Sequence, residues 1–220
     1  MEWVGILLAV FLVLLNAFFV ATEFAIVKVR PTRVEELIRN NRPGAISVRH
    51  VVKHLDRYLS ATQLGITLAS LGLGWLGEPA FARLIQPPLE NLGLFDPWII
   101  HTMAFGFAFA TISFLHIVVG EIAPKSLALR RAEKVALVAA VPMRIFNGLF
   151  FPAIWFLNTV AIGLLKILGL GPSTADRTSA HSEEEIKIIL SQARSAGLLS
   201  AERAEILHKA LTLPSRTARH

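Results

Sequence analysis

The sequence predicts an all-α membrane protein with three transmembrane helices, an amphipathic juxtamembrane helix and a short cytoplasmic helical connector. Three observations lead to this prediction. Of the 220 residues, 54% are hydrophobic and only 17% are charged. The mean hydropathy of +0.56 is too high for an ordinary soluble domain and is typical of a small membrane protein. Finally, lysine and arginine gather beside alternate ends of the apolar runs, as they do in membrane proteins of defined orientation.

The first predicted span covers residues 3–27, about 25 residues, which is long enough to cross a bilayer. It lacks a basic n-region and exceeds a typical h-region, so we interpret it as a retained span and not a cleaved signal. The next segment, residues 28–57, contains eight Lys/Arg and three acidic residues. The positive-inside rule places this loop in the cytoplasm and the N-terminus outside. Within it, a short surface helix is expected to start at Pro31 and to end at Arg42-Pro43-Gly44.

The second predicted span, residues 58–85, is less apolar and belongs inside a helix bundle. It has a stripe of small residues at helical spacing, which allows helices to approach closely in lipid: Ala61, Gly65, Ala69 and nearby Gly72. A separate polar face contains Gln63, Thr67, Ser70 and Gly74. The following loop, residues 86–97, has no Lys or Arg and is expected outside.

The third predicted span, residues 98–122, returns the chain to the cytoplasm, where four basic residues follow: Lys125, Arg130, Arg131 and Lys134. Residues 135–170 are apolar but interrupted. A transmembrane hairpin would need about 40 residues and would place Arg144 inside the bilayer, whereas a single crossing would move the polar tail outside. We therefore favour an amphipathic helix on the cytoplasmic membrane surface over an additional span.

The C-terminal segment has the composition of short soluble helices. Ser182 with Glu185 forms a capping box, Gly197 ends the first helix, and Ser200 caps the second. The acidic triplet 183–185 is interpreted as complementing a helix N-terminus, with a cation sensor as the alternative. We expect residues 1–172 to form the transmembrane domain and residues 173–220 to begin a truncated cytoplasmic helical region.

One stretch, HIVVGEIAPKSLALRR at residues 116–131, carries the candidate site. An ionisable residue inside a span is expensive and usually functional, and Glu121 is such a residue. Pro124 has no N–H, so the carbonyl of Gly120 loses its helical partner. The two groups together offer hard oxygen ligands, which Mg²⁺ and Ca²⁺ require, at the end of a span. The alternative is that Glu121 pairs with Lys125 and anchors the helix at the interface.

Neighbouring helices are expected to complete the ligand shell. Ser70 on the polar face of the second span is the first choice, and Asn16, Val20 and Glu23 share one face of the first span. His101 and His116 lie in the third span without a third nitrogen or sulfur ligand, so we interpret them as packing or interface residues. The chain has no cysteine, which excludes disulfides and thiolate metal sites.

Other functional classes receive little support. The net charge of +6 lies mostly in one loop beside a span, where anionic lipid and topology explain it, so no nucleic-acid partner is expected. The sequence has no glycine-rich phosphate loop and no Ser-His-Asp order, so we do not expect an enzyme.

Three blocks resemble the signatures of the CorC / cyclin-M (CNNM) magnesium-transporter family and its transmembrane (DUF21) domain, in order and spacing. They are LLNAFFVATEFAIVKVRPTRVEEL, LSATQLGITLASLGLGWLGEP and HIVVGEIAPKSLAL. The resemblance covers residues 4 to about 213. It implies a homodimer in the plasma membrane with three transmembrane helices per subunit, and Mg²⁺ export that in several members is coupled to Na⁺ entry.

Carried over to this sequence, the resemblance implies an ion site at Glu121, the Gly120 carbonyl, Ser70 and the backbone near Val20. Family members continue into a pair of cystathionine-β-synthase domains that bind ATP. The chain is expected to stop before these domains, so ATP is not expected to bind it. Two functions stay open: a secondary transporter that moves Mg²⁺ outward, and a membrane sensor or accessory subunit that regulates another transporter. A carboxylate beside an interrupted helix favours the transporter.

Overall fold

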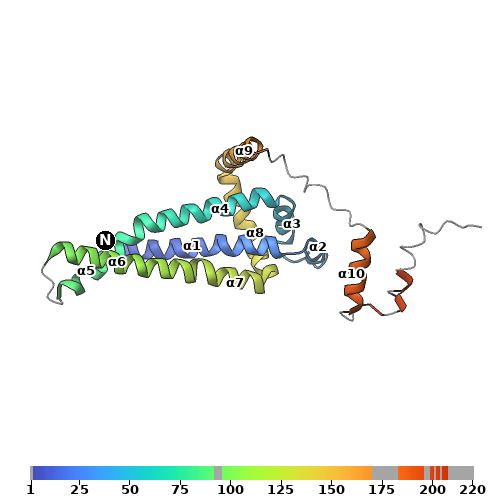
Figure 1. Ribbon diagram of the computed structural model, residues 1–220, viewed down its shortest axis with the longest axis horizontal. Helices are drawn as coiled ribbons and strands as arrows, with labels where there is room; N and C mark the ends of the chain where they lie inside the picture. Colours follow the sequence, from blue (N-terminus) through green and yellow to red (C-terminus); the bar gives the residue numbers. More distant parts are fainter. Residues whose placement is uncertain are drawn as a thin grey trace, which may run out of the picture. The chain divides into compact units, whose positions relative to one another are not determined.

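A computed structural model (Figure 1) describes residues 2–91, 96–169, 183–195, 199–200, 202–203 and 205–207. The chain divides into two compact units, Met1–Gly163 and Leu164–His220. All regular elements in the described residues are helices, which confirms the all-α class. The predicted boundary between residues 172 and 173 falls outside the described residues and stays a prediction.

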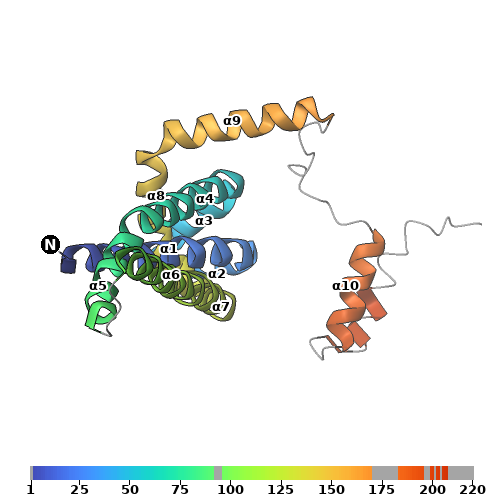
Figure 2. The same cartoon turned by 60° about the vertical axis from the view of Figure 1, so that its left-hand side comes forward.

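Three long helical runs lie side by side in the first unit (Figures 1 and 2). The first is α1 (Glu2–Lys28), a single uninterrupted helix. The second consists of α4 (Leu55–Gly72), the π-helical segment η1 (Leu73–Gly77) and α5 (Glu78–Asn91). The third consists of α6 (Pro97–Leu115), the π-helical segment η2 (His116–Ile122) and α7 (Ala123–Arg130).

These runs confirm the three predicted spans and extend two of them. By length and composition the candidate spans are Trp3–Lys28, Leu55–Leu89 and Pro97–Arg130. The second continues beyond the predicted end, since α5 runs to Asn91 with Pro87 and Pro88 inside the helix, so the first part of the expected external loop is helical. The third span begins at a regular cap, where the carboxylate of Asp96 accepts a hydrogen bond from the backbone N–H of Trp98 at 2.9 Å.

The small-residue stripe of the second span permits a close helix contact, as predicted, and its partner is α1 of the same chain. Ala61, Gly65 and Ala69 are buried, and a Cβ added at Gly65 would lie 2.5 Å from the ring of Phe19. The absence of a side chain at Gly65 therefore allows α1 and α4 to approach. Large apolar side chains on the outer faces are exposed instead, such as Phe109 at 60%. Such a surface matches lipid and not water.

Two short helices follow the first span and confirm the predicted break. They are α2 (Pro31–Arg39) and α3 (Ala45–Lys53). Between them Gly44 adopts φ +83°, and a Cβ there would lie 2.7 Å from the carbonyl oxygen of Leu137. Glycine is required at this turn both by the positive φ and by the close approach of Leu137, which lies in the later helix spanning residues 132–149.

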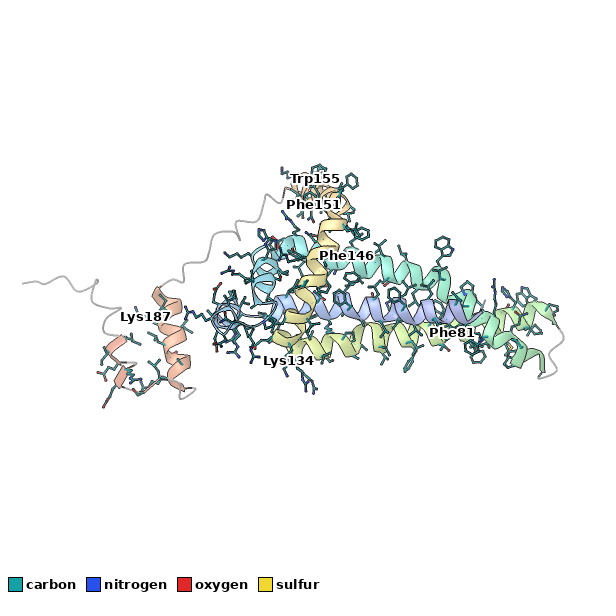
Figure 3. The ribbon with its side chains drawn as sticks, turned by 180° about the vertical axis from the view of Figure 1, so that it is seen from behind. Phe81, Lys134, Phe146, Phe151, Trp155 and Lys187 are labelled. Carbon is teal, nitrogen blue, oxygen red and sulfur yellow. The ribbon has the colours of Figure 1, made fainter. Side chains whose placement is uncertain are left out.

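Residues 132–167 form two helices joined by a sharp bend. These are α8 (Ala132–Leu149) and α9 (Phe151–Ile167), which are bent by 80° relative to each other. Figure 3 shows α8 crossing α1, with Lys134 at its start and Phe146 near its end. Arg144 donates to the hydroxyl of Ser47 on α3 at 3.1 Å. The expected surface helix stays a prediction, because length and composition also allow the bent pair to form a fourth span.

The second unit contains α10 (Glu183–Ser195). The hydroxyl of Ser200 accepts a hydrogen bond from the backbone N–H of Arg203 at 3.4 Å, in agreement with its predicted capping role. Ser182 and Gly197, which were predicted to start and end the preceding helix, lie outside the described residues.

Candidate functional site

The third span changes its helical winding where the sequence predicts a break. The segment η2 is π-helical, and the backbone N–H of Ala123 reaches the carbonyl of Val118 five residues earlier. The helix then continues through the buried Pro124 to Arg130, so the expectation that the span ends at the proline is wrong. The wider turn accommodates a position that has no N–H, which is how transmembrane helices tolerate proline. Single π-turns of this kind often occur at functional sites.

Side chains from all three spans meet at η2. The amide Nδ2 of Asn16 on α1 donates to the carbonyl oxygen of Gly120 at 3.0 Å, and this hydrogen bond is buried. The hydroxyl of Ser70 on α4 donates to Oδ1 of Asn16 at 3.4 Å. The structure thus brings together three of the predicted site residues, and the Gly120 carbonyl does find a partner outside its own helix.

A fourth member of this network is His116. Its Nε2 lies 3.3 Å from the hydroxyl oxygen of Ser70, and its Cδ2 would lie 2.9 Å from a Cβ added at Gly120. We interpreted His116 from the sequence as a packing or interface residue. One sequence signal could have placed His116 at the site: it lies four residues before Gly120, and residues four apart share a helix face.

Glu121 is exposed on the single chain and does not join this network. Among the described residues, neither an ion pair nor a hydrogen bond involves its carboxylate. Lys125, the alternative partner, has its Nζ 4.6 Å from the centre of the Phe24 ring. The Glu121–Lys125 pair is therefore absent from the described part of the chain, and the charge of Glu121 has no compensating partner there.

Val20 is buried one turn beyond Asn16 on α1. Because α1 is an uninterrupted α-helix, the carbonyl at position 20 faces the N–H of residue 24. A carbonyl oxygen has a second lone pair, which leaves capacity for a cation. Glu23, on the same face, accepts a hydrogen bond from Gln63 at 3.1 Å. This contact joins the two polar faces that were predicted for the first and second spans.

We call the place where Asn16, Ser70 and Gly120 meet at η2 the crossing of the three spans. The candidate ligand atoms at this crossing are hard oxygens, and most of them are neutral. The described residues contain no group of three or more His, Cys, Asp or Glu side chains that could hold a metal ion. A cation here would depend on the oxygens of Asn16, Ser70 and Gly120, which are at present engaged with one another. The nearest acidic side chain in sequence is Glu121. Such a set suits Mg²⁺ or another hard cation and not a soft transition metal.

The fold and this crossing define a class: an all-α, multi-pass membrane domain with a polar network between its spans. The chain belongs to the CNNM family, because residues 7–203 match the sequence profile of that family, which is described as "Cyclin M transmembrane N-terminal domain". This confirms the resemblance that was inferred from the three sequence blocks.

Curated bacterial proteins are similar over almost the whole chain. UPF0053 protein YhdT of Bacillus subtilis is 45% identical over 216 residues, which is 98% of this chain and 45% of that protein. UPF0053 protein YrkA of the same organism is 40% identical over 219 residues, which is 100% of this chain and 50% of that protein. The chain therefore spans about half the length of these relatives.

Proposed function

We propose that this domain carries Mg²⁺ across the plasma membrane, outward and in exchange for entering Na⁺. The observation that supports this most directly is the meeting of Asn16, Ser70 and the Gly120 carbonyl from three different spans at one π-helical turn. Oxygen ligands contributed by an interrupted helix are the usual cation site of membrane transporters. Membership of the CNNM family supports the same class of function.

Each residue has a distinct role in this proposal. Glu121 supplies the negative charge that a partly dehydrated Mg²⁺ needs, and the Gly120 carbonyl, freed by Pro124, is a neutral ligand next to it in sequence. Ser70 and Asn16 contribute a hydroxyl and an amide oxygen, and the carbonyl of Val20 is a further candidate on the same face of α1. In the ion-free arrangement these polar groups satisfy one another, which keeps them from being unpaired in the membrane.

The alternative is a membrane sensor or accessory subunit that binds Mg²⁺ and regulates another transporter. Neither alternative requires catalysis, and we propose no enzymatic activity. Purified protein in liposomes with an enclosed Mg²⁺-sensitive dye separates the two functions. A transporter moves Mg²⁺ by itself, and an imposed Na⁺ gradient accelerates this movement if the ions are exchanged. Saturable Mg²⁺ binding without any flux would exclude the transporter and leave the sensor.

The proposed orientation has the N-terminus outside and the basic loop 28–57 in the cytoplasm, together with the polar C-terminal region. Its support is the distribution of lysine and arginine: the end of α1 is followed by residues 28–57 with eight Lys/Arg, and α7 ends at Arg130. Single cysteines introduced at Asn41 and Asn91 are expected to react with an impermeant maleimide from opposite sides of sealed vesicles. Labelling of both from the same side would contradict the three-span topology.

We also propose that the functional unit is a homodimer in the lipid bilayer, with one ion site in each subunit. The support is indirect: the family resemblance, and a Glu121 carboxylate that is exposed on the single chain. A charged side chain facing lipid is unfavourable, so a neighbouring subunit or a bound ion is needed to shield it. Mg²⁺ is the transported ion and Na⁺ the counter-ion in this scheme, and this chain is not proposed to bind ATP.

A further inference from the structure

Two adjoining grooves lie where the first and third spans end. The larger, about 760 Å³, is lined by residues around the junction of α1 with α2 and the junction of α7 with α8. Lys28, the last residue of one candidate span, and Arg130, the last residue of another, both line it. This basic groove therefore lies at the expected level of the lipid headgroups.

The basic groove carries a strong positive charge. Its lining has six cationic and two acidic side chains, a net charge of +4, and the cations are Lys28, Arg30, Arg33, Arg130, Arg131 and Lys134. Only Arg33 is paired: its Nε donates to Glu133 at 2.8 Å and its guanidinium also contacts Glu36. These hydrogen bonds, first that to Glu133, raise the pKa of Arg33.

The other five cations are exposed and form no ion pair with the described residues. Two helices also begin at this groove, α2 at Pro31 and α8 at Ala132. Neither of the preceding residues, Arg30 and Arg131, caps its helix with its side chain. The first-turn N–H groups therefore add to the positive potential of the groove.

The second groove is apolar and shares two residues with the first. It has a volume of about 320 Å³ and is lined by Phe18, Ala21 and Thr22 of α1, by Leu127, and by apolar residues of α8. Arg131 and Lys134 line both grooves, and Figure 3 shows Lys134 at the start of α8. Since Phe18 lies well inside the first span, the apolar groove extends from the headgroup level toward the bilayer interior.

We propose that the two grooves together bind one anionic phospholipid, with its phosphate in the basic groove and an acyl chain in the apolar groove. The unpaired cations provide the charge complementarity, and two of them lie where the two grooves meet, which is where the glycerol phosphate would be. A soluble phosphate would use only the first groove. The apolar groove, which continues from the same two cations, is the reason for choosing the lipid.

Lipid titration of the full purified protein in detergent, followed by native mass spectrometry, tests this proposal. The probes are phosphatidylglycerol and phosphatidylcholine with identical acyl chains. The test variant is Arg131→Gln/Lys134→Gln, and the matched control is Arg39→Gln/Arg42→Gln, which removes the same charge from the same cytoplasmic side without touching either groove. Glycerol 3-phosphate and inorganic phosphate serve as soluble competitors that lack acyl chains.

We expect one phosphatidylglycerol per chain, bound at least tenfold more tightly than phosphatidylcholine. Loss of two cations should weaken it about thirty-fold, at roughly a factor of five for each cation near a membrane surface, and the control should stay within about twofold of the parent. Equal weakening in both variants would show diffuse surface charge and overturn the site. Displacement of the lipid by millimolar glycerol 3-phosphate or inorganic phosphate would overturn the choice of a lipid as the ligand.

Discussion

Glu121→Gln is expected to reduce Mg²⁺ binding and flux by well over tenfold while the protein stays folded. The substitution keeps the size of the side chain and removes its charge, and no described residue relies on that charge for an ion pair. The remaining candidate ligands at the crossing are neutral oxygens. Mg²⁺ dehydrates reluctantly, so neutral ligands alone should bind it poorly. The measurement is dye-reported flux in liposomes together with equilibrium Mg²⁺ binding.

Three comparison variants show whether a loss is specific to the site. Glu35→Gln removes a carboxylate from α2, outside the spans, where its contact with Arg49 is long at 3.8 Å, and should leave transport unchanged. Ser70→Ala should have a smaller effect than Glu121→Gln, because water can replace one neutral ligand. Pro124→Ala restores an N–H to the helix and should also weaken the site, since the Gly120 carbonyl regains a backbone donor. Normal flux through folded Glu121→Gln protein would refute the proposed ion site.

Gly65→Ala is expected to destabilise the packing of α1 against α4. The added Cβ would lie 2.5 Å from ring atoms of Phe19, and Phe19 is itself only 3% exposed, within the main apolar core. The ring cannot move without displacing its neighbours, so the two helices must separate. Overpacking of this kind typically costs about 1–3 kcal/mol. A lower midpoint of thermal unfolding in detergent would measure it.

Gly148→Ala is the matched control for this substitution. Outside its chain neighbours and the backbone of its own helix, no atom of the described residues lies within 4 Å of the added Cβ, and the residue lies near the end of helix α8. Alanine is the better helix former by up to about 1 kcal/mol, so this variant should be neutral or slightly more stable. If Gly65→Ala behaved in the same way, close approach of α1 and α4 at that position would not be required for stability.

Much of the fold follows from local sequence features. The length of each apolar run predicts the spans, and the lysine and arginine residues predict the sides of the membrane. Spacing of small residues identifies the face of the second span that packs closely against another helix, although not which helix. Pro31 and Gly44 mark the ends of the first surface helices, because these residues restrict or free the backbone without help from distant contacts. These features act within one or two helical turns.

The candidate site was only partly predictable. Proline chemistry identified Gly120, and helical spacing identified Ser70 and Asn16, but spacing within one helix does not say which faces of different helices meet. His116 was missed for this reason: its partner Ser70 is 46 residues away. The sequence also suggested a Glu121–Lys125 pair from i,i+4 spacing, whereas the ring of Phe24 on α1 lies beneath Lys125 instead.

The sequence by itself determined that this is a multi-span helical membrane protein of the CNNM family with a polar, proline-interrupted segment in its third span. Those properties depend on composition, on residue order and on hydrogen bonds within single helices. Only the tertiary structure decided that the third span continues through Pro124 by a π-turn, that the amide of Asn16 donates to the Gly120 carbonyl, and that two grooves meet at Arg131 and Lys134. Each of these depends on how closely separate helices pack, which the local sequence does not encode.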